Sequence, residues 1–139
     1  EECCLTHTKM FDGVEEVLNE LNEKKIKWGI ITNKPRRFAE GIVQNKLGKL
    51  KPPFLICPDD VGTRKPEPDG LLHALTLSVS KPENSIYIGD HQIDIKAGER
   101  ANMLTGAAAY GYIPLNDTVN KWKADYVFDE ANEIIALVE

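Results

Sequence analysis

The amino-acid sequence predicts an α/β fold in which a parallel sheet is flanked by helices. Short apolar, β-branched runs recur along its 139 residues, and segments whose apolar side chains have helical spacing lie between these runs. Strands that alternate with helices in this way form βαβ units, which build parallel sheets. The composition, 42% hydrophobic and 28% charged, is that of a globular domain able to bury a core.

Capping and periodicity predict the first elements. Asp12, with Glu15 three residues later, forms a capping-box pattern that predicts a helix over 13–24. The apolar run at 26–32 is rich in isoleucine and is typical of a buried parallel strand. Pro35 then opens a second helix, because proline is favoured in the first turn.

The same alternation continues to the end of the chain, after a break at 48–53 that contains glycine and prolines. We predict strands at 54–57, 86–88, 104–109 and 126–128, and helices at 69–79, 93–102 and 130–138. Residues 110–123, with Gly111 and Pro114, form the longest predicted loop. The chain therefore contains enough strands and crossover helices for a single sheet.

Charge and composition argue against several classes of function. The net charge of −5 argues against a nucleic-acid binder that works through a broad basic surface, although a local basic pocket stays open. The chain has no apolar run as long as the roughly 18 to 20 residues that a membrane span needs. Three cysteines without a CxxC pair favour a reduced, cytoplasmic compartment and structural thiols.

Polar residues stand where the predicted strands end. Thr32 and Asn33 follow the strand at 26–32, and Asp90 follows the strand at 86–88. Lys65 lies just before the helix at 69–79. Because ligands of open parallel sheets gather outside the carboxyl ends of the strands, we expect these side chains to share one site.

These residue types suit a phosphoryl group and Mg²⁺. Asp90 and Asp94 are four residues apart and repel each other unless a cation or a lysine lies between them. Mg²⁺ is the natural cation, because it prefers hard oxygen ligands and retains waters and substrate phosphate. Thr32 and Asn33 offer a hydroxyl and an amide for phosphate oxygens, and Lys65 offers a full positive charge.

Each feature alone also has a simpler interpretation. Thr32 is typical of a turn, Lys65 of a solvated loop, and Asp90 of a helix cap. His91 beside the acids is either a surface residue or a substrate contact. The order of the polar positions 32, 65 and 90 along the alternating strands and helices favours a site over three unrelated local roles.

This ordered set resembles the haloacid dehalogenase-like phosphohydrolases over essentially the whole chain. The second, third and fourth motifs of that family are similar to Ile31-Thr32-Asn33, Lys65-Pro66 and the stretch 89–94. The resemblance implies that Thr32 binds phosphoryl oxygens and that Lys65 neutralises an aspartyl-phosphate intermediate. It also implies that Asp90 ligates Mg²⁺ and that Asp94 supports the metal or holds Lys65.

At a finer level the chain resembles the phosphoglycolate phosphatase group. The stretches 11–14, 32–35, 65–68 and 110–112 carry that likeness. The stretches 28–29, 37–40, 55–59 and 120–125 are more similar to bacterial N-acetylmuramic acid 6-phosphate phosphatases. The resemblance implies a cytoplasmic enzyme whose substrate is a small phosphorylated metabolite, such as 2-phosphoglycolate or N-acetylmuramate 6-phosphate.

One motif of the family has no counterpart. The family's first motif, a DxDGT-type stretch that supplies the nucleophile, is absent, and the nearest pattern is Asp59-Asp60. Covalent catalysis requires that carboxylate, so we expect this chain by itself to bind Mg²⁺ weakly and to hydrolyse nothing. A non-catalytic phosphate- or Mg²⁺-binding or scaffold protein of the same fold, which has lost its nucleophile, is the alternative.

The missing motif also has a structural consequence. The resemblance implies a Rossmann-like core that lacks its first, central strand and its cap, with 1–12 the end of the cap or a linker and 13–139 the C-terminal part of the core. We expect exposed edges on the strands that end at Thr32 and Gly89, with the missing segment supplied by the rest of the parent protein. Otherwise those strands pair directly, or a second copy swaps a strand into the gap.

Overall fold

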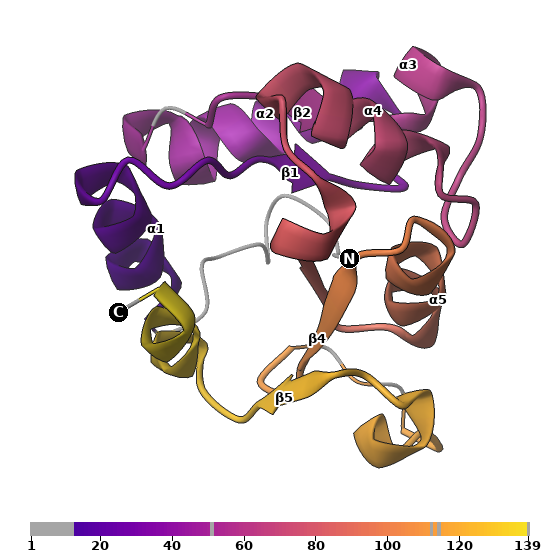
Figure 1. Ribbon diagram of the computed structural model, residues 1–139. Helices are drawn as coiled ribbons and strands as arrows, with labels where there is room; N and C mark the ends of the chain where they lie inside the picture. The colour runs from indigo at the N-terminus through magenta and orange to yellow at the C-terminus, as the bar shows by residue number, and fades with distance from the viewer. Residues whose placement is uncertain (1–12, 51, 112, 114, 139) are drawn as a thin grey trace.

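The computed structural model describes residues 13–138 with the exception of 51, 112 and 114. Helices and parallel strands alternate along this part of the chain (Figure 1), which confirms the predicted α/β class. The elements are α1 (Val14–Glu23), β1 (Ile30–Ile31), α2 (Arg36–Leu47), η1 (Gly48–Leu50), β2 (Leu55–Ile56), α3 (Pro58–Val61), α4 (Asp69–Ser78), η2 (Pro82–Asn84), β3 (Ile86–Gly89), α5 (Gln92–Arg100), β4 (Leu104–Ala108), η3 (Val119–Trp122), β5 (Tyr126–Phe128) and η4 (Ala131–Val138), where η marks a 3₁₀ helix.

The strands form two separate parallel sheets. β1 pairs with β2, and β3, β4 and β5 pair in that order. Within the described residues β1 does not pair with β3, so direct pairing of the strands that end at Thr32 and Gly89 is not observed. The predicted gap between these two strands is therefore confirmed.

A cavity of about 860 Å³ lies in this gap. The β1 side contributes Trp28, Gly29 and Ile31, and β3 contributes Ile86 and Tyr87. We call it the inter-sheet cavity. Residues 26–29, which the sequence predicts as strand, line this cavity and do not pair with another strand. A β-branched sequence forms a strand only where a neighbouring strand accepts and donates its backbone hydrogen bonds. The strand predicted at 26–32 is thereby reduced to Ile30–Ile31.

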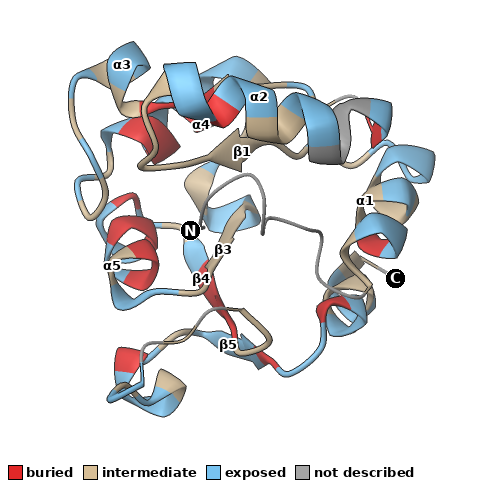
Figure 2. Cartoon of the chain, turned by 180° about the vertical axis from the view of Figure 1, so that it is seen from behind, coloured by how far each residue is buried: buried red, intermediate tan, exposed pale blue. Residues whose placement is uncertain are grey.

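The core joins the two sheets through helices rather than through strands. Leu71 of α4, Ala97 of α5 and Ala101, the C-cap residue of α5, form a buried cluster, against which Ile31 and Tyr87 pack. Figure 2 shows buried residues concentrated on α4, α5 and β4. These helices therefore fix the distance between β1 and β3.

Several boundaries differ from the sequence predictions. α1 begins after Gly13, which makes no side-chain capping bond, and the predicted cap Asp12 lies outside the described residues. The predicted helix 130–138 is a 3₁₀ helix, η4, and it packs against α1 (Figure 1). The predicted loop 110–123 contains η3, anchored by the buried Trp122.

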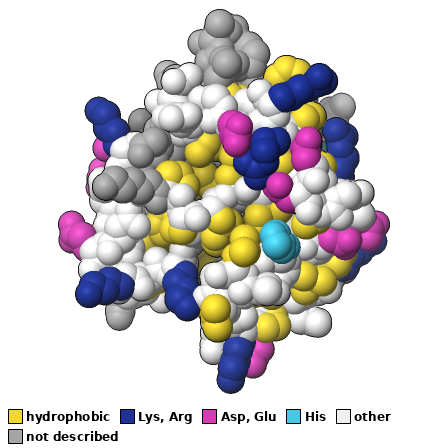
Figure 3. All heavy atoms as spheres, turned by 90° about the horizontal axis from the view of Figure 1, so that it is seen from above, with side chains coloured by type: hydrophobic (Ala, Val, Ile, Leu, Met, Phe, Trp, Pro, Cys, Tyr) yellow, Lys and Arg dark blue, Asp and Glu magenta, His cyan; other side chains and the backbone are white. Residues whose placement is uncertain are grey.

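Two surface properties complete the fold. Large hydrophobic side chains stay exposed on α2 and α4, and Figure 3 shows hydrophobic atoms in the middle of the face seen from above, with charged side chains around them. None of the helices in the described part of the chain is both long and apolar enough to cross a membrane.

Candidate active site

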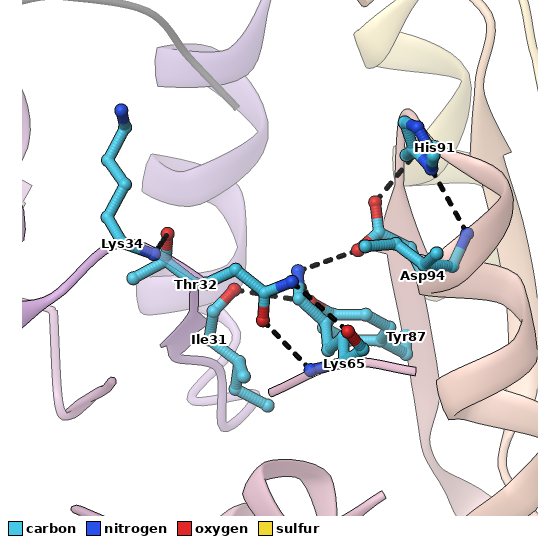
Figure 4. A network of polar contacts seen from close by, with 9 residues as sticks. Ile31, Thr32, Lys34, Lys65, Tyr87, His91 and Asp94 are labelled. Carbon is cyan, nitrogen blue, oxygen red and sulfur yellow. Dashed lines mark hydrogen bonds and ion pairs between the residues drawn. The ribbon is translucent and has the colours of Figure 1, made fainter. Parts of the chain in front are cut away.

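Three of the predicted residues converge at the carboxyl ends of β1 and β3. Thr32 follows β1, Asp94 lies in the first turn of α5, and Lys65 reaches them from the loop between α3 and α4 (Figure 4). The Thr32 hydroxyl accepts a hydrogen bond from the Lys34 backbone N–H at 3.1 Å, which fixes the turn after the strand. The parallel arrangement thus places these side chains at one edge, as the sequence predicts.

Lys65 is the most constrained group of the site. Its Nζ donates to Asp94 Oδ1 at 2.6 Å and to the Tyr87 hydroxyl at 2.8 Å. The Lys65 and Asp94 side chains are only 8% and 7% exposed. Burial by itself lowers the pKa of Lys65, but Tyr87 and Asp94 outweigh it and raise that pKa well above its ordinary value. Lys65 is therefore a fixed ammonium at neutral pH.

Asp94 has a partner for each carboxylate oxygen. Oδ1 accepts from Lys65, and Oδ2 accepts from the His91 backbone N–H at 3.2 Å. His91 itself accepts at Nδ1 from the Ile93 N–H, so the pair closes a capping box at the start of α5. Of the two roles that the family resemblance left for Asp94, the contact with Lys65 is present in the structure.

Asn33 contacts Lys65 as well, but through the backbone. Its Oδ1 accepts from the Lys65 N–H at 2.9 Å, and its Nδ2 donates to the Lys65 carbonyl at 3.2 Å. This reciprocal pair fixes the loop that carries Lys65 to the end of β1. The phosphate contact predicted for Asn33 stays a prediction.

Asp90 lies against the turn that follows β4. A Cβ at Gly111 would overlap the Cβ of Asp90, so the close approach of this turn requires glycine. Burial and the Asp90 charge raise the pKa of Tyr110, which lies in the same turn. In the sequence, positions 110–112 stand out by their similarity to phosphoglycolate phosphatases, and no pattern there marks them as part of the site.

The described residues do not form a complete magnesium centre. No group of three or more His, Cys, Asp or Glu side chains in this part of the chain could hold a metal ion. Asp94 is committed to Lys65, so the predicted metal role rests mainly on Asp90, whose charge also acts on Tyr110. The metal assignments of Asp90 and Asp94 stay predictions, and the chain needs further oxygen donors to fit Mg²⁺.

The acid pair Asp59-Asp60 serves the fold instead of the site. Asp60 accepts from Arg36 Nη2 at 2.6 Å, and Asp59 accepts from the Arg36 backbone N–H at 2.9 Å. The Arg36 guanidinium holds the pKa of Asp60 below its ordinary value. Next to this pair, Cys57 is a buried free thiol whose pKa is raised by burial, in line with its predicted structural role.

Replacing Gly89 by alanine should displace Asp94 and, with it, Lys65. A Cβ at Gly89 would overlap Asp94 Cβ, Cγ and Oδ2, so the carboxylate has to move. We expect a stability loss of about 1–3 kcal/mol and, in the complete protein, a loss of turnover of about 10- to 100-fold. Gly41→Ala is the matched control, because nothing lies within 4 Å of its Cβ. Equal urea-unfolding curves for the two variants would contradict the prediction.

The chain matches known proteins over most of its length. The family model described as "Haloacid dehalogenase-like hydrolase" matches residues 1–108. An N-acetylmuramic acid 6-phosphate phosphatase of Pseudomonas putida is 38% identical over 98% of this chain and 61% of its own length. A phosphoglycolate phosphatase of Xanthomonas campestris is 33% identical over 93% of this chain and 58% of its own length.

Solved structures share the fold of this chain. The crystal structure of a HAD family hydrolase from Deinococcus radiodurans superposes on this chain with a TM-score of 0.87 at 23% sequence identity. The match covers 96% of this chain and 61% of the Deinococcus chain. The chain spans about three-fifths of the length of the curated relatives it matches. From the family match over residues 1–108 and the shared fold, we conclude that this chain belongs to the haloacid dehalogenase-like hydrolases.

Proposed function

We propose that the complete protein is a Mg²⁺-dependent phosphomonoesterase that acts on a small phosphorylated metabolite, such as 2-phosphoglycolate or N-acetylmuramate 6-phosphate. The observation that carries the proposal is the buried ammonium of Lys65, fixed beside Thr32 at the carboxyl ends of two parallel strands. The names of the relatives from Pseudomonas putida and Xanthomonas campestris support the substrate class.

The site residues suit phosphoryl transfer. The transferred group carries negative charge throughout the reaction, so catalysis consists mainly of positioning and charge neutralisation. Lys65 supplies a positive charge, because the raised pKa of its amine keeps that group protonated at neutral pH. Thr32 supplies a hydroxyl at the end of β1, and Asn33 holds the Lys65 loop at that end.

The proposed reaction needs a carboxylate nucleophile, for which this sequence offers no DxDGT-type motif. We place it in a segment of the complete protein upstream of residue 1. A carboxylate oxygen attacks phosphorus, the bond from phosphorus to the metabolite oxygen breaks, and that oxygen takes up a proton. Water then hydrolyses the aspartyl-phosphate, which releases inorganic phosphate and restores the carboxylate. Mg²⁺, bound in part by Asp90, would neutralise phosphoryl charge, with its remaining donors from the same segment and from water.

The proposal extends to the place where that segment docks. The inter-sheet cavity between β1 and β3 is one site at which a further parallel strand would pair on both sides. The strand would come from the upstream segment, with 13–139 as the C-terminal part of the core and 1–12 as cap end or linker. A strand swapped from a second copy is the other source. We place the complete protein in the cytoplasm.

The test is phosphate release by the complete protein, measured with both candidate substrates and with or without Mg²⁺. We expect Mg²⁺-dependent release, with a clear preference for one of the two compounds. Equal and poor turnover of both would remove the subfamily assignment while leaving the phosphatase. Release from neither compound nor from a panel of sugar and acid phosphates would favour the non-catalytic phosphate- or Mg²⁺-binding or scaffold alternative.

A further inference from the structure

We propose that Tyr87 is a positioning residue that aims the Lys65 ammonium at the substrate phosphoryl group. The inference rests on the proposed function and adds to it a residue that no sequence motif marks. Tyr87 stands on β3 three residues before Asp90, and its hydroxyl lies 2.8 Å from Lys65 Nζ. Nζ lies 5.3 Å from the ring centroid, so the hydroxyl is the atom of Tyr87 that Lys65 contacts most closely.

The hydrogen bonds of Lys65 set the direction of its remaining N–H donor. An ammonium group has three N–H donors in a tetrahedral arrangement. Asp94 accepts one at 2.6 Å and Tyr87 accepts a second at 2.8 Å. Two bonds in different directions fix the position of Nζ as well as the rotation of its N–H groups, so the third donor points in a single direction. With Asp94 as its one partner, the lysine side chain could swing about that bond and carry the third donor away from the substrate.

The Tyr87 hydroxyl is oriented in turn by β1. It donates its own proton to the carbonyl oxygen of Ile31 at 3.1 Å, so a lone pair is left facing Lys65 (Figure 4). Ile30 and Thr32 direct their N–H groups to β2. The backbone of Ile31 therefore faces the inter-sheet cavity, because successive residues of a strand direct their backbone groups to opposite sides. A carbonyl oxygen has two lone pairs, so this bond is compatible with a strand docked in the cavity.

The consequence is a link between two parts of the site. Ile31 directly precedes Thr32. Any shift of β1 therefore moves the Thr32 hydroxyl together with the Ile31 carbonyl oxygen that accepts the Tyr87 proton. The Tyr87 side chain packs against the buried cluster of Leu71, Ala97 and Ala101, which holds the ring in place. Tyr87 thus keeps the phosphate-binding hydroxyl of Thr32 and the charge of Lys65 at a constant separation.

Tyr87→Phe tests the inference, because it removes the hydroxyl and keeps the ring. In this chain, we expect acetic anhydride to modify the Lys65 amine about tenfold faster than in the unsubstituted chain, as followed by mass spectrometry. Tyr126→Phe, on the partly exposed β5, is the matched control and leaves the Lys65 rate unchanged. In the complete protein, kcat should fall about 10- to 100-fold with little change in KM.

A second variant separates positioning from loosening of the core. Leu71→Val perturbs the same buried cluster without touching a polar group of the site. At a temperature where both variants are folded, faster labelling in Tyr87→Phe alone supports the inference, and equal acceleration in both overturns it. Unchanged labelling and unchanged kcat in Tyr87→Phe also overturn it. If the unsubstituted complete protein releases no phosphate, the proposed function fails, and the labelling rates still decide the role of Tyr87.

Discussion

Lys65→Met in the complete protein is expected to reduce phosphate release by at least about 100-fold. The substitution keeps most of the side-chain volume and removes the charge that we propose neutralises the phosphoryl group. KM for the metabolite should change less than kcat, because the charge that develops in the transition state is the main target of the ammonium. Steady-state kinetics of purified Lys65→Met, compared with the unsubstituted protein, measure the effect.

The same substitution also affects stability, and a double variant separates the two effects. Asp94 is 7% exposed, so without Lys65 it becomes a buried, uncompensated charge. We expect Lys65→Met to lose about 3–5 kcal/mol of unfolding free energy and Lys65→Met/Asp94→Leu to recover much of it. The double variant should stay inactive. Recovery of turnover along with stability would show that Lys65 acts on the fold alone.

Asp90→Asn is expected to reduce Mg²⁺-dependent phosphate release by about 100-fold or more at low metal concentration. The amide is isosteric with the carboxylate, so Asp90→Asn fits the space beside Gly111 and the fold should persist. It removes the negative charge that a hard cation prefers. The Mg²⁺ dependence of the initial rate should shift to higher concentrations, and circular dichroism should show an unchanged fold.

Asp69→Asn is the matched control for that experiment. Asp69 is an exposed acid in the first turn of α4, outside the site, and its substitution should leave the Mg²⁺ dependence unchanged. If Asp90→Asn shows the same Mg²⁺ dependence and the same maximal rate as Asp69→Asn, Asp90 is not part of a metal site, and the metal assignment has to move to other residues.

Local sequence patterns predicted the order of the elements and the edge at which the polar residues meet. Both depend on information within a few residues, namely the spacing of apolar side chains and the polar residues that follow them. Thr32 and Asp94 lie just after the carboxyl ends of β1 and β3, and Lys65 reaches them from the loop between α3 and α4. No long-range contact had to be known for that prediction.

Long-range partners were not predictable in this way. Tyr87 stands between two isoleucines and has the pattern of a core residue, whereas its hydroxyl bonds a carbonyl 56 positions earlier. The Asn33 side chain likewise donates a hydrogen bond to the carbonyl oxygen of Lys65, 32 positions later. The length of β1 depends on which neighbour it has, and a local run of isoleucines does not carry that information.

The split of the sheet has a consequence for how this chain unfolds. Strand pairing normally spreads cooperativity across a parallel sheet, but here no ladder within the described residues connects β1–β2 to β3–β5. The two halves are joined by the α4–α5 cluster and by the polar contacts of Lys65. We therefore expect them to open as two foldons with separate free energies, and the amide hydrogens of β1 and β2 to exchange through a smaller opening than those of β4. A strand docked between them would merge both into one cooperative unit.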